Sequence, residues 1–407
     1  MNATDRPRLR AVEPVQVEVE GRTLIALKDP DSYSEETALV DPGLLGLLVV
    51  FDGISTIDEI CARLESEGVK GVTPDGLTTL AESLDRCFLL DNERFRDERA
   101  AREAAFASEP VRAAAHAGSA YPAGADEART FLDEMLGDGA GDKTQTSTGH
   151  VRRLIAPHID LRLGADVHGG AHRALAGAPR PERVVVLGVC HAASDRRVIA
   201  CRKDFATPLG TLRHDAAFLD ALEARSGDCF DADQMTHKAE HSVEFQALWI
   251  ARHWPDNPPL LVPLLIGSFH DLIEDARSPA DDPEIDKFVN ALRDTIAEAR
   301  GTTLLIASVD LAHRGPRYGD ADGLDEDAET EQESADRVLL DHIVAGDAES
   351  FFQDIAHDKN ARNVCGVAPI YLTLRLDETP GELLSYGQGR IDPDTGSLVT
   401  YTAVAFP

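Results

Sequence analysis

The stretch RVVVLGVCHAAS, Arg183 to Ser194, decides how the second half of this chain folds. Its first seven residues are almost continuously apolar, which is typical of a strand that is buried on both faces of a sheet. Cys190 and His191 follow directly, where ordinary turn residues would be expected. Because a buried strand needs only apolar residues, this polar pair serves either the turn or a functional site.

Further apolar runs of the same kind alternate with helical patterns from Arg152 to the end of the sequence. These runs are RRLIAP, PLLVPLLIG, TTLLIAS, GELLSYG and VTYTAVAF. Short buried strands separated by helices are typical of an α/β sheet in which many strands run parallel. The sequence therefore predicts an α/β domain built around a largely parallel or mixed sheet.

The first hundred residues have a different pattern. VQVEVEG and TLIALKD alternate around a short turn and predict a β-hairpin. TIDEICARLESEG carries a capping box from Thr56 to Glu59, and a further helix is predicted to begin after Thr73, with Pro74 at its first position. A hairpin with helices of this length predicts a small winged-helix-like α+β domain.

The charge of the chain restricts its partners. It carries 72 acidic and 40 basic residues, a formal net charge of −32 at pH 7. Phosphate backbones and anionic lipid surfaces are poor partners for such a protein. Residues 1–108 hold 22 acidic and 12 basic residues, so the winged-helix-like domain is not expected to bind DNA. We expect no nucleic acid and no membrane among the partners.

Two further features bear on location. No apolar run approaches the roughly 18 residues of a membrane span, and the start MNATDRPRLR lacks the apolar stretch of a secretory signal. The six cysteines are scattered and form no CxxC motif, as is typical of a reducing compartment. We therefore expect a cytoplasmic protein.

Reactive residues gather just past the predicted strands. In open α/β sheets the carboxyl ends of the strands carry the ligand site, so these residues should converge. One set follows three strands, another lies in HKAEHSVEF, and a cysteine stands in NVCGVAP. The candidates are His158, Asp160, His191, Asp310 and His313; His237, Glu240, His241 and Glu244; and Cys365.

Each candidate also has a simpler interpretation. A lone histidine after a strand is commonly a core or turn histidine, although three strand ends that carry His or Asp favour a site. Cys365 is either a small buried hydrophobe or, at a predicted helix start, a thiolate. His237 and His241 have the i, i+4 spacing of zinc ligands, but the stretch is not HExxH, and a loop leading into a helix near Ser242 is an alternative.

The motifs APHIDL, LGVCHA, HKAEHSVEFQ, ASVDLAHRGPRYGD and CGVAPIY resemble, in order and spacing, those of the Memo family, in the bacterial branch called AmmeMemoRadiSam system protein B. AHAGSAYP and VTYTAVAFP extend the resemblance. The front end is similar to PqqD-like peptide-recognition domains in its hairpin, in LLVVFDGISTIDEICARL and in RCFLLDNERF. The implied organisation is a PqqD-like domain at 1–97, a helical linker at 98–114 and a Memo-like domain at 115–407.

This resemblance implies a fold and a site. Memo proteins share the fold of LigB-type extradiol dioxygenases, a mixed sheet flanked by helices. Carried over residue by residue, the implied metal ligands are His158, His191 and Cys365. The implied catalytic residues are His313 and Asp310, which match an SSD..H motif, and Glu240 and His241, which match an EHS element.

Three positions depart from the family pattern. Asp160 stands in PHIDL, where many members have Pro-His-Ala-Gly-Tyr; Ala192 replaces a second histidine; and Val367 replaces an Arg that often follows Cys-Gly. The three implied ligands remain. Relative to the family pattern, the substitutions change the residues that would contact a substrate.

Two imidazoles and one sulfur would leave open positions on a metal, as a catalytic site requires. Iron and copper are the expected metals, with zinc as a further option. The implied activity is metal-dependent redox or dioxygenase-like chemistry on a small or peptide-linked substrate, with His313 as proton donor or acceptor and Asp310 or Glu240 fixing a histidine tautomer.

Two alternatives stay open. One is a non-catalytic metal- or peptide-binding partner of a radical SAM enzyme and an AMMECR1-like protein, with a peptide bound at the N-terminal domain. The other is a zinc hydrolase with His313 as base.

Overall fold

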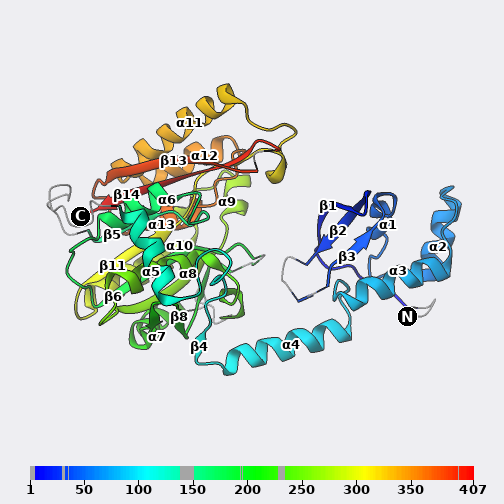
Figure 1. Ribbon diagram of the computed structural model, residues 1–407, viewed down its shortest axis with the longest axis horizontal. Coiled ribbons are helices and arrows are strands. Elements are labelled where there is room, and N and C mark those ends of the chain that lie inside the picture. Colours follow the sequence, from blue (N-terminus) through cyan, green and yellow to red (C-terminus); the bar gives the residue numbers. More distant parts are fainter. Residues whose placement is uncertain are drawn as a thin grey trace. The chain divides into compact units, whose positions relative to one another are not determined.

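The computed structural model consists of two compact units, Met1–Ser108 and Glu109–Pro407. The structure describes residues 5–29, 33–34, 36–137, 151–192, 194, 196–227, 234–392 and 394–407. Each unit is described by itself below (Figure 1).

The first unit combines a small antiparallel sheet with helices. Its sheet has the order β1-β2-β3, and β1 and β2 form the predicted hairpin. The strands are β1 (Glu13–Val19), β2 (Arg22–Lys28) and β3 (Ala38–Val40), and the helices are η1 (Pro42–Leu44), α1 (Leu45–Leu48), α2 (Ile57–Ser66), α3 (Pro74–Arg86) and α4 (Glu93–Ser108).

The helix starts of this unit follow from their capping residues. Thr56 accepts a hydrogen bond from the Glu59 N–H, and the Glu59 carboxylate accepts one from the Thr56 N–H, so the predicted capping box is confirmed. Thr73 caps α3 with Pro74 in its first turn. The apolar faces of both helices then pack with the sheet in one core.

The second unit is built on an eight-stranded mixed sheet with the order β12-β14-β5-β11-β6-β10-β7, in which β13 pairs with β14. The neighbours β5, β11, β6 and β10 are parallel, and the outer strands are antiparallel. Its strands are β5 (Arg153–Ala156), β6 (Arg183–Val189), β7 (Val198–Ala200), β10 (Leu260–Ile266), β11 (Thr303–Ser308), β12 (His313–Arg314), β13 (Glu382–Asp392) and β14 (Ser397–Phe406).

Alternation along β6 divides the helices between two faces of the sheet. Val184 and Val186 pack in the cluster that includes α6 and α8, whereas Val185 and Leu187 pack with α7 and α9 to α13. The helices are α5 (Ala125–Leu136), α6 (Ala165–Arg173), α7 (Ala216–Ser226), α8 (His241–His253), α9 (His270–Glu274), α10 (Pro283–Glu298), α11 (Glu326–Ala345), α12 (Ala348–His357) and α13 (Val367–Leu376), with 3-10 turns η4 (Gln234–His237), η5 (Pro279–Asp281) and η6 (Pro316–Tyr318).

The predicted fold class, a mixed sheet flanked by helices and preceded by a small α+β unit, is confirmed. All six apolar runs form strands. A second small sheet of the order β4-β8-β9 was not expected; its strands are β4 (Val111–Arg112), β8 (Asp204–Thr207) and β9 (Gly210–Leu212). The predicted domain limits at residues 97 and 114, and the PqqD-like relationship, stay predictions.

Two further observations concern membrane spans and cysteines. Among the described residues, no helix is long and apolar enough to cross a membrane. Five cysteines are free thiols, and Cys229 lies outside the described residues.

Candidate metal centre

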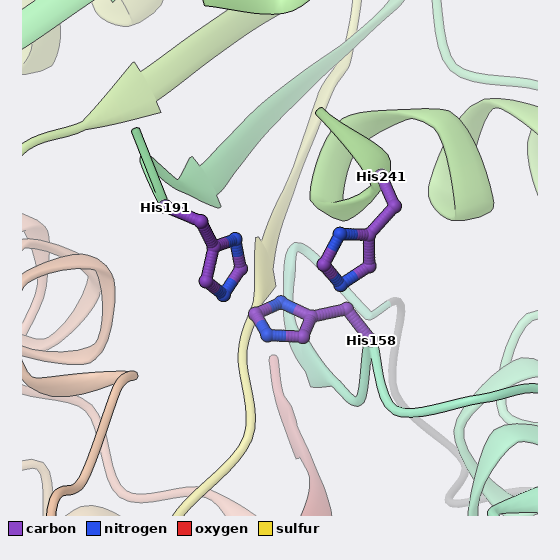
Figure 2. A group of neighbouring side chains, drawn as sticks. All are labelled: His158, His191 and His241. Atoms are coloured by element: carbon purple, nitrogen blue, oxygen red, sulfur yellow. The ribbon is translucent and has the colours of Figure 1, made fainter. Parts of the chain in front are cut away.

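Three histidines meet at the carboxyl-terminal edge of the parallel strands. His158 follows β5, His191 follows β6, and His241 is the first residue of α8. One ligand atom of each lies within 4.8 Å of the other two, and Figure 2 shows the three rings turned toward one another. Their ring centroids are 5.0, 5.1 and 4.9 Å apart. Three imidazoles at this spacing are a possible site for one metal ion.

The strand order explains this convergence. β11 lies between β5 and β6 in the sheet, and all three strands run parallel. The loops that leave β5 and β6 therefore pass on either side of the end of β11, which carries Asp310.

His158 is held in one tautomer by the backbone. Its side chain is 2% exposed, and its Nδ1 lies 2.9 Å from the Ser308 carbonyl, which can only accept. Nδ1 therefore carries the proton, and Nε2 presents its lone pair to the centre. Burial, together with the neighbouring His191 and His241, holds the pKa of His158 well below its ordinary value, so the ring is neutral.

Glu240 holds the other two histidines. Its carboxylate lies 3.0 and 3.1 Å from His191 Nδ1, 3.3 Å from His241 Nδ1, and accepts the backbone N–H groups of His191 and Ser242. Burial alone would raise the pKa of Glu240, but His191, His241 and the Ser242 N–H lower it well below its ordinary value. The carboxylate is thus ionised, fixes the proton of His191 on Nδ1 and leaves Nε2 free for a ligand role.

Glu240 raises the pKa of both histidines, but their net shifts are opposite because burial weighs differently on each. Burial lowers the pKa of His191, but the hydrogen bond and charge of Glu240 raise it by more, so the net pKa lies above its ordinary value. For His241 burial dominates and lowers the pKa to about 4. His241 is thus neutral at pH 7.

Asp310 supports the loop that carries His158. Its Oδ1 accepts the backbone N–H groups of His158 and Ile159, each at 3.1 Å, and its Oδ2 lies 3.5 Å from His158 Nε2. Burial raises the pKa of Asp310 to about 7, against the effect of those N–H groups. This carboxyl can therefore hold or release a proton near neutral pH.

Cys365 completes the wall of the centre. Its Sγ lies 3.6 Å from His158 Nε2 and 3.6 Å from the Asp310 carbonyl oxygen, just before α13 begins. Burial and the nearby Asp310 raise the pKa of the Cys365 thiol well above its ordinary value. Without a bound cation it is a thiol, and a bound metal would displace its proton.

His313 takes a different place. It is the first residue of β12, and its Nδ1 lies 3.1 Å from the Leu311 carbonyl oxygen, while its ring contacts Tyr318 edge-on at 4.9 Å. Burial lowers the pKa of His313 to about 4. It is a neutral imidazole outside the group of three histidines.

The structure thus brings His158, His191, Cys365, Glu240, His241 and Asp310 together, and it places other candidates elsewhere. His237 lies in η4, where its Nε2 contacts the Ile199 carbonyl at 3.0 Å, so it does not share a helical face with His241. Asp160 is exposed and caps a turn by accepting the N–H groups of Arg162 and Leu163.

Glu244, a candidate from HKAEHSVEF, forms a buried network whose partners were not predicted from the sequence. Glu244 is 1% exposed, pairs with Arg112 and accepts the N–H groups of Ala115 and His116 and the Tyr121 hydroxyl. This network fixes the AHAGSAY stretch against α8. The signal was a glutamate on an otherwise apolar face of α8, which needs a buried partner.

The donor set suits a metal. The lone-pair nitrogens of His158 and His191 are fixed by acceptors on their opposite ring atoms, as is common for histidine ligands. A thiol stands beside them, and the imidazole–thiolate combination suits iron, copper or zinc.

Comparison with known proteins identifies relatives. Residues 112–405 match the family described as Memo-like protein. A MEMO1 family protein of Aquifex aeolicus is 26% identical over 384 residues, which cover 93% of this chain and 95% of that protein. A relative in Thermus thermophilus is 28% identical, and the match covers 79% of this chain and 89% of that protein. A relative in Methanopyrus kandleri is 29% identical, and the match covers 72% of this chain and 98% of that protein. Both are also called MEMO1 family proteins.

Proposed function

Because this chain belongs to the Memo-like family, we propose that its second unit binds one redox-active metal ion and uses it for dioxygenase-like chemistry. The observation that carries the proposal is the convergence of His158, His191 and His241 within 4.8 Å. Cys365 Sγ, 3.6 Å from His158 Nε2, is the fourth candidate donor.

The two histidines would bind the metal through their Nε2 atoms. His158 offers a neutral Nε2 atom and His191 an Nε2 atom that would lose its proton when a metal binds, and their ring orientations are set by Ser308 and Glu240. Iron or copper held there would supply one-electron and dioxygen chemistry that side chains alone cannot perform. The Irving–Williams order favours copper or zinc over iron at equal availability, so metal identity needs a direct measurement.

The chain itself supplies proton handling. The Asp310 carboxyl, with its pKa near 7, holds or releases a proton at Oδ2, 3.5 Å from His158 Nε2. His313 is a neutral acceptor, since burial keeps its pKa about 4.

The test is anaerobic loading with iron(II) followed by nitric oxide. We expect a high-spin iron–nitrosyl electron paramagnetic resonance signal in the wild type, lost in His158→Ala and kept in His357→Ala, an exposed histidine at the end of α12. Absence of the signal in the wild type would overturn the redox proposal. If the purified protein contains zinc as its only metal and shows no redox response, the hydrolase alternative is favoured.

A second candidate function concerns the first unit. Its described surface exposes several large apolar side chains near β3 and α1: Leu39 46%, Leu44 38%, Leu45 37%, Val49 80% and Ile54 72%. Exposed apolar residues that form one patch are typical of interaction surfaces. We propose that it docks a peptide or a protein of the radical SAM system.

The docking proposal has its own test. Val49→Glu with Ile54→Glu should reduce co-purification of the radical SAM enzyme and the AMMECR1-like protein with the full chain. Val19→Glu, a change at another exposed apolar position, is the control. Equal recovery from all three proteins would contradict the proposal.

A further inference from the structure

A short segment of backbone, residues 237–240, leads from η4 into the candidate centre. It ends at Glu240, whose carboxylate contacts His191 and His241. All four residues of the segment are described, and they belong to no strand. Its buried carbonyl groups therefore need partners from outside a sheet ladder. Whatever holds this backbone also determines where the Glu240 carboxylate lies.

Arg112 holds both ends of this segment. Its Nε donates to the His237 carbonyl oxygen at 2.8 Å, and its Nη2 donates to the Glu240 carbonyl oxygen at 2.9 Å. Its Nη1 pairs with the Glu244 carboxylate and donates to the Ala113 carbonyl oxygen at 3.0 Å. The Arg112 side chain is fully buried, and all three of its nitrogens have acceptors.

His116 holds the middle of the segment. Its Nε2 lies 2.9 Å from the Ala239 carbonyl oxygen, which can only accept, so this nitrogen carries the proton. Side chains from residues 112–116 thus donate to the carbonyl groups of residues 237, 239 and 240. The conformation of the segment is therefore fixed by a second stretch of chain far away in the sequence.

The small sheet β4-β8-β9 gives Arg112 a rigid base. Arg112 pairs with Phe205 in the parallel β4–β8 ladder, and its guanidinium carbon lies 5.2 Å from the centroid of the Phe205 ring. Phe205 packs in the same apolar cluster as Val243, in the first turn of α8. This sheet, which the sequence did not predict, therefore carries Arg112 beside the helix that bears His241.

Two properties of arginine are used at this position. The buried Glu244 carboxylate needs a counter-charge, which any cation could supply. The two carbonyl groups of the segment need donors at fixed angles, and the planar guanidinium offers five N–H donors in a rigid fork. The ammonium of a lysine is a single compact charge and cannot reach all of these acceptors together. Charge and shape can therefore be separated by substitution.

We infer that Arg112 is a positioning residue of the candidate centre: it fixes the backbone of residues 237–240, thereby places Glu240, and through Glu240 orients His191 and His241. The inference adds a residue outside the centre, and it rests on the proposed function in that these histidines are taken to bind a metal.

Arg112→Lys keeps a charge beside Glu244 and removes the fork. In the metal-free full chain, we expect the amides of His191 and Ser242, which donate to Glu240, to exchange with deuterium about tenfold faster. Cobalt(II) affinity should fall about tenfold, and the visible spectrum of the bound cobalt should change. Amide exchange and cobalt affinity that both equal those of the wild type would overturn the inference.

A second buried arginine controls for the loss of an ion pair. Arg183 Nε donates to the buried Asp215 carboxylate at 2.8 Å, and Arg183 is the first residue of β6, at the opposite end of that strand from His191. Arg183→Lys should lower the urea midpoint of unfolding without changing the exchange of the His191 amide or the cobalt spectrum. Equal changes in Arg183→Lys and Arg112→Lys would overturn the inference, because Arg112 would then serve stability alone.

Arg112→Met combined with Glu244→Gln covers the case in which Arg112→Lys does not fold. The two changes remove both buried charges, which proteins tolerate far better than the loss of one partner. The carbonyl groups of His237 and Glu240 still lose their donors. We expect a folded protein with fast exchange of the His191 amide and weakened cobalt binding. Wild-type values for both in this folded double variant would overturn the inference.

The metal-free measurement keeps the two proposals apart. Faster exchange of the His191 amide in Arg112→Lys but not in Arg183→Lys, in a chain whose wild type binds no cobalt, would support the positioning role and overturn the proposed function. One cobalt ion per wild-type chain, with amide exchange and cobalt affinity unchanged in Arg112→Lys, would overturn the positioning role and leave the metal centre standing.

Discussion

Glu240 is the residue on which the geometry of the candidate centre depends most. It is 7% exposed, contacts both His191 and His241, and caps α8 through the Ser242 N–H. One ionised carboxylate thus sets a ring tautomer, a ring orientation and a helix start. Carboxylates behind histidine ligands are commonly worth a factor of about 10–100 in metal affinity.

Glu240→Gln tests this role. The amide keeps the size of the side chain but removes the charge, so metal affinity should fall about 10- to 100-fold. Competition with a coloured chelator measures the change. Glu333→Gln, at an exposed position of α11, is the matched control and should bind as the wild type does. An affinity in Glu240→Gln equal to that of the control would show that the carboxylate has no such role.

The residue scale is also where sequence and structure differ most. His158, His191 and Cys365 could be singled out because each follows a predicted strand or precedes a predicted helix. The Memo resemblance implied His241 as a catalytic residue, and the structure places its ring among the candidate metal ligands, at a helix start one residue before the expected Ser242. That start is set by the capping carboxylate of Glu240, which a linear pattern does not reveal.

At the scale of elements, α8 reaches the centre because β6 has a glycine beneath it. A Cβ on Gly188 would lie 2.5 Å from Ser242 Oγ and 2.9 Å from Val243 Cγ2, both in the first turn of α8. Ser242 Oγ in turn donates to the Val189 carbonyl. Close approach of helix and strand therefore requires glycine at this position.

Gly188→Ala should push the start of α8, and with it His241, away from β6. Overpacking of this kind costs about 1–3 kcal/mol, and metal affinity should fall with it. Urea unfolding and metal titration measure the two effects. Gly46→Ala, where an added Cβ meets nothing within 4 Å, is the control. A Gly188→Ala protein as stable as Gly46→Ala would contradict the packing argument.

Histidines buried between elements should make the folded protein less stable at low pH. His168 on α6 is fully buried, its Nε2 lies 3.0 Å from the Ile159 carbonyl oxygen, and burial lowers its pKa to about 4. Its Nδ1 has no partner within the described part of the chain. In the unfolded chain His168 takes up a proton near pH 6.5, its ordinary pKa, whereas in the folded protein it does so only near pH 4. Its contribution to the free energy of unfolding is therefore complete above pH 6.5 and is lost as the pH falls toward 4.

Between pH 6.5 and 4, this histidine should contribute a slope of roughly 1.4 kcal/mol per pH unit to the free energy of unfolding. His168→Gln should reduce the slope by that amount in chelator-treated protein. Replacing the exposed His357 by Gln is the control. An identical slope in His168→Gln and the wild type would refute the linkage.

In the second unit, the sequence predicted the strands that lie in strongly apolar runs and did not predict the others. β5, β6, β10, β11, β13 and β14 are apolar enough to be recognised alone. β4, β7, β8 and β9 have only two to four residues each, and their pairing joins segments far apart in the chain, as β4 with β8. Such strands are determined by tertiary contacts rather than by local pattern.

For the whole molecule, the two units have separate cores. The cluster around Ile57 and Leu84 belongs to the first unit, and the clusters on both faces of β6 belong to the second. A metal bound at His158, His191 and His241 touches only the second unit. Metal binding should therefore stabilise that unit alone.

Scanning calorimetry with and without zinc tests this. We expect two transitions, of which only the one from the second unit moves upward, by the equivalent of about 2.7 kcal/mol at a free metal concentration 100 times Kd. His158→Ala should abolish the shift. A single transition, or an equal shift of both, would show that the units unfold together.

The central claim is that one metal ion binds where His158, His191 and His241 meet, beside Cys365. Its most direct test is the number of cobalt(II) ions bound per chain, with the absorption spectrum, in the wild type and in four variants. We predict one ion per chain, weakened by alanine at each of the three histidines, and a sulfur-to-metal charge-transfer band lost in Cys365→Ser. Cobalt binding that is absent from the wild type, or unchanged by all three histidine substitutions, would contradict the account.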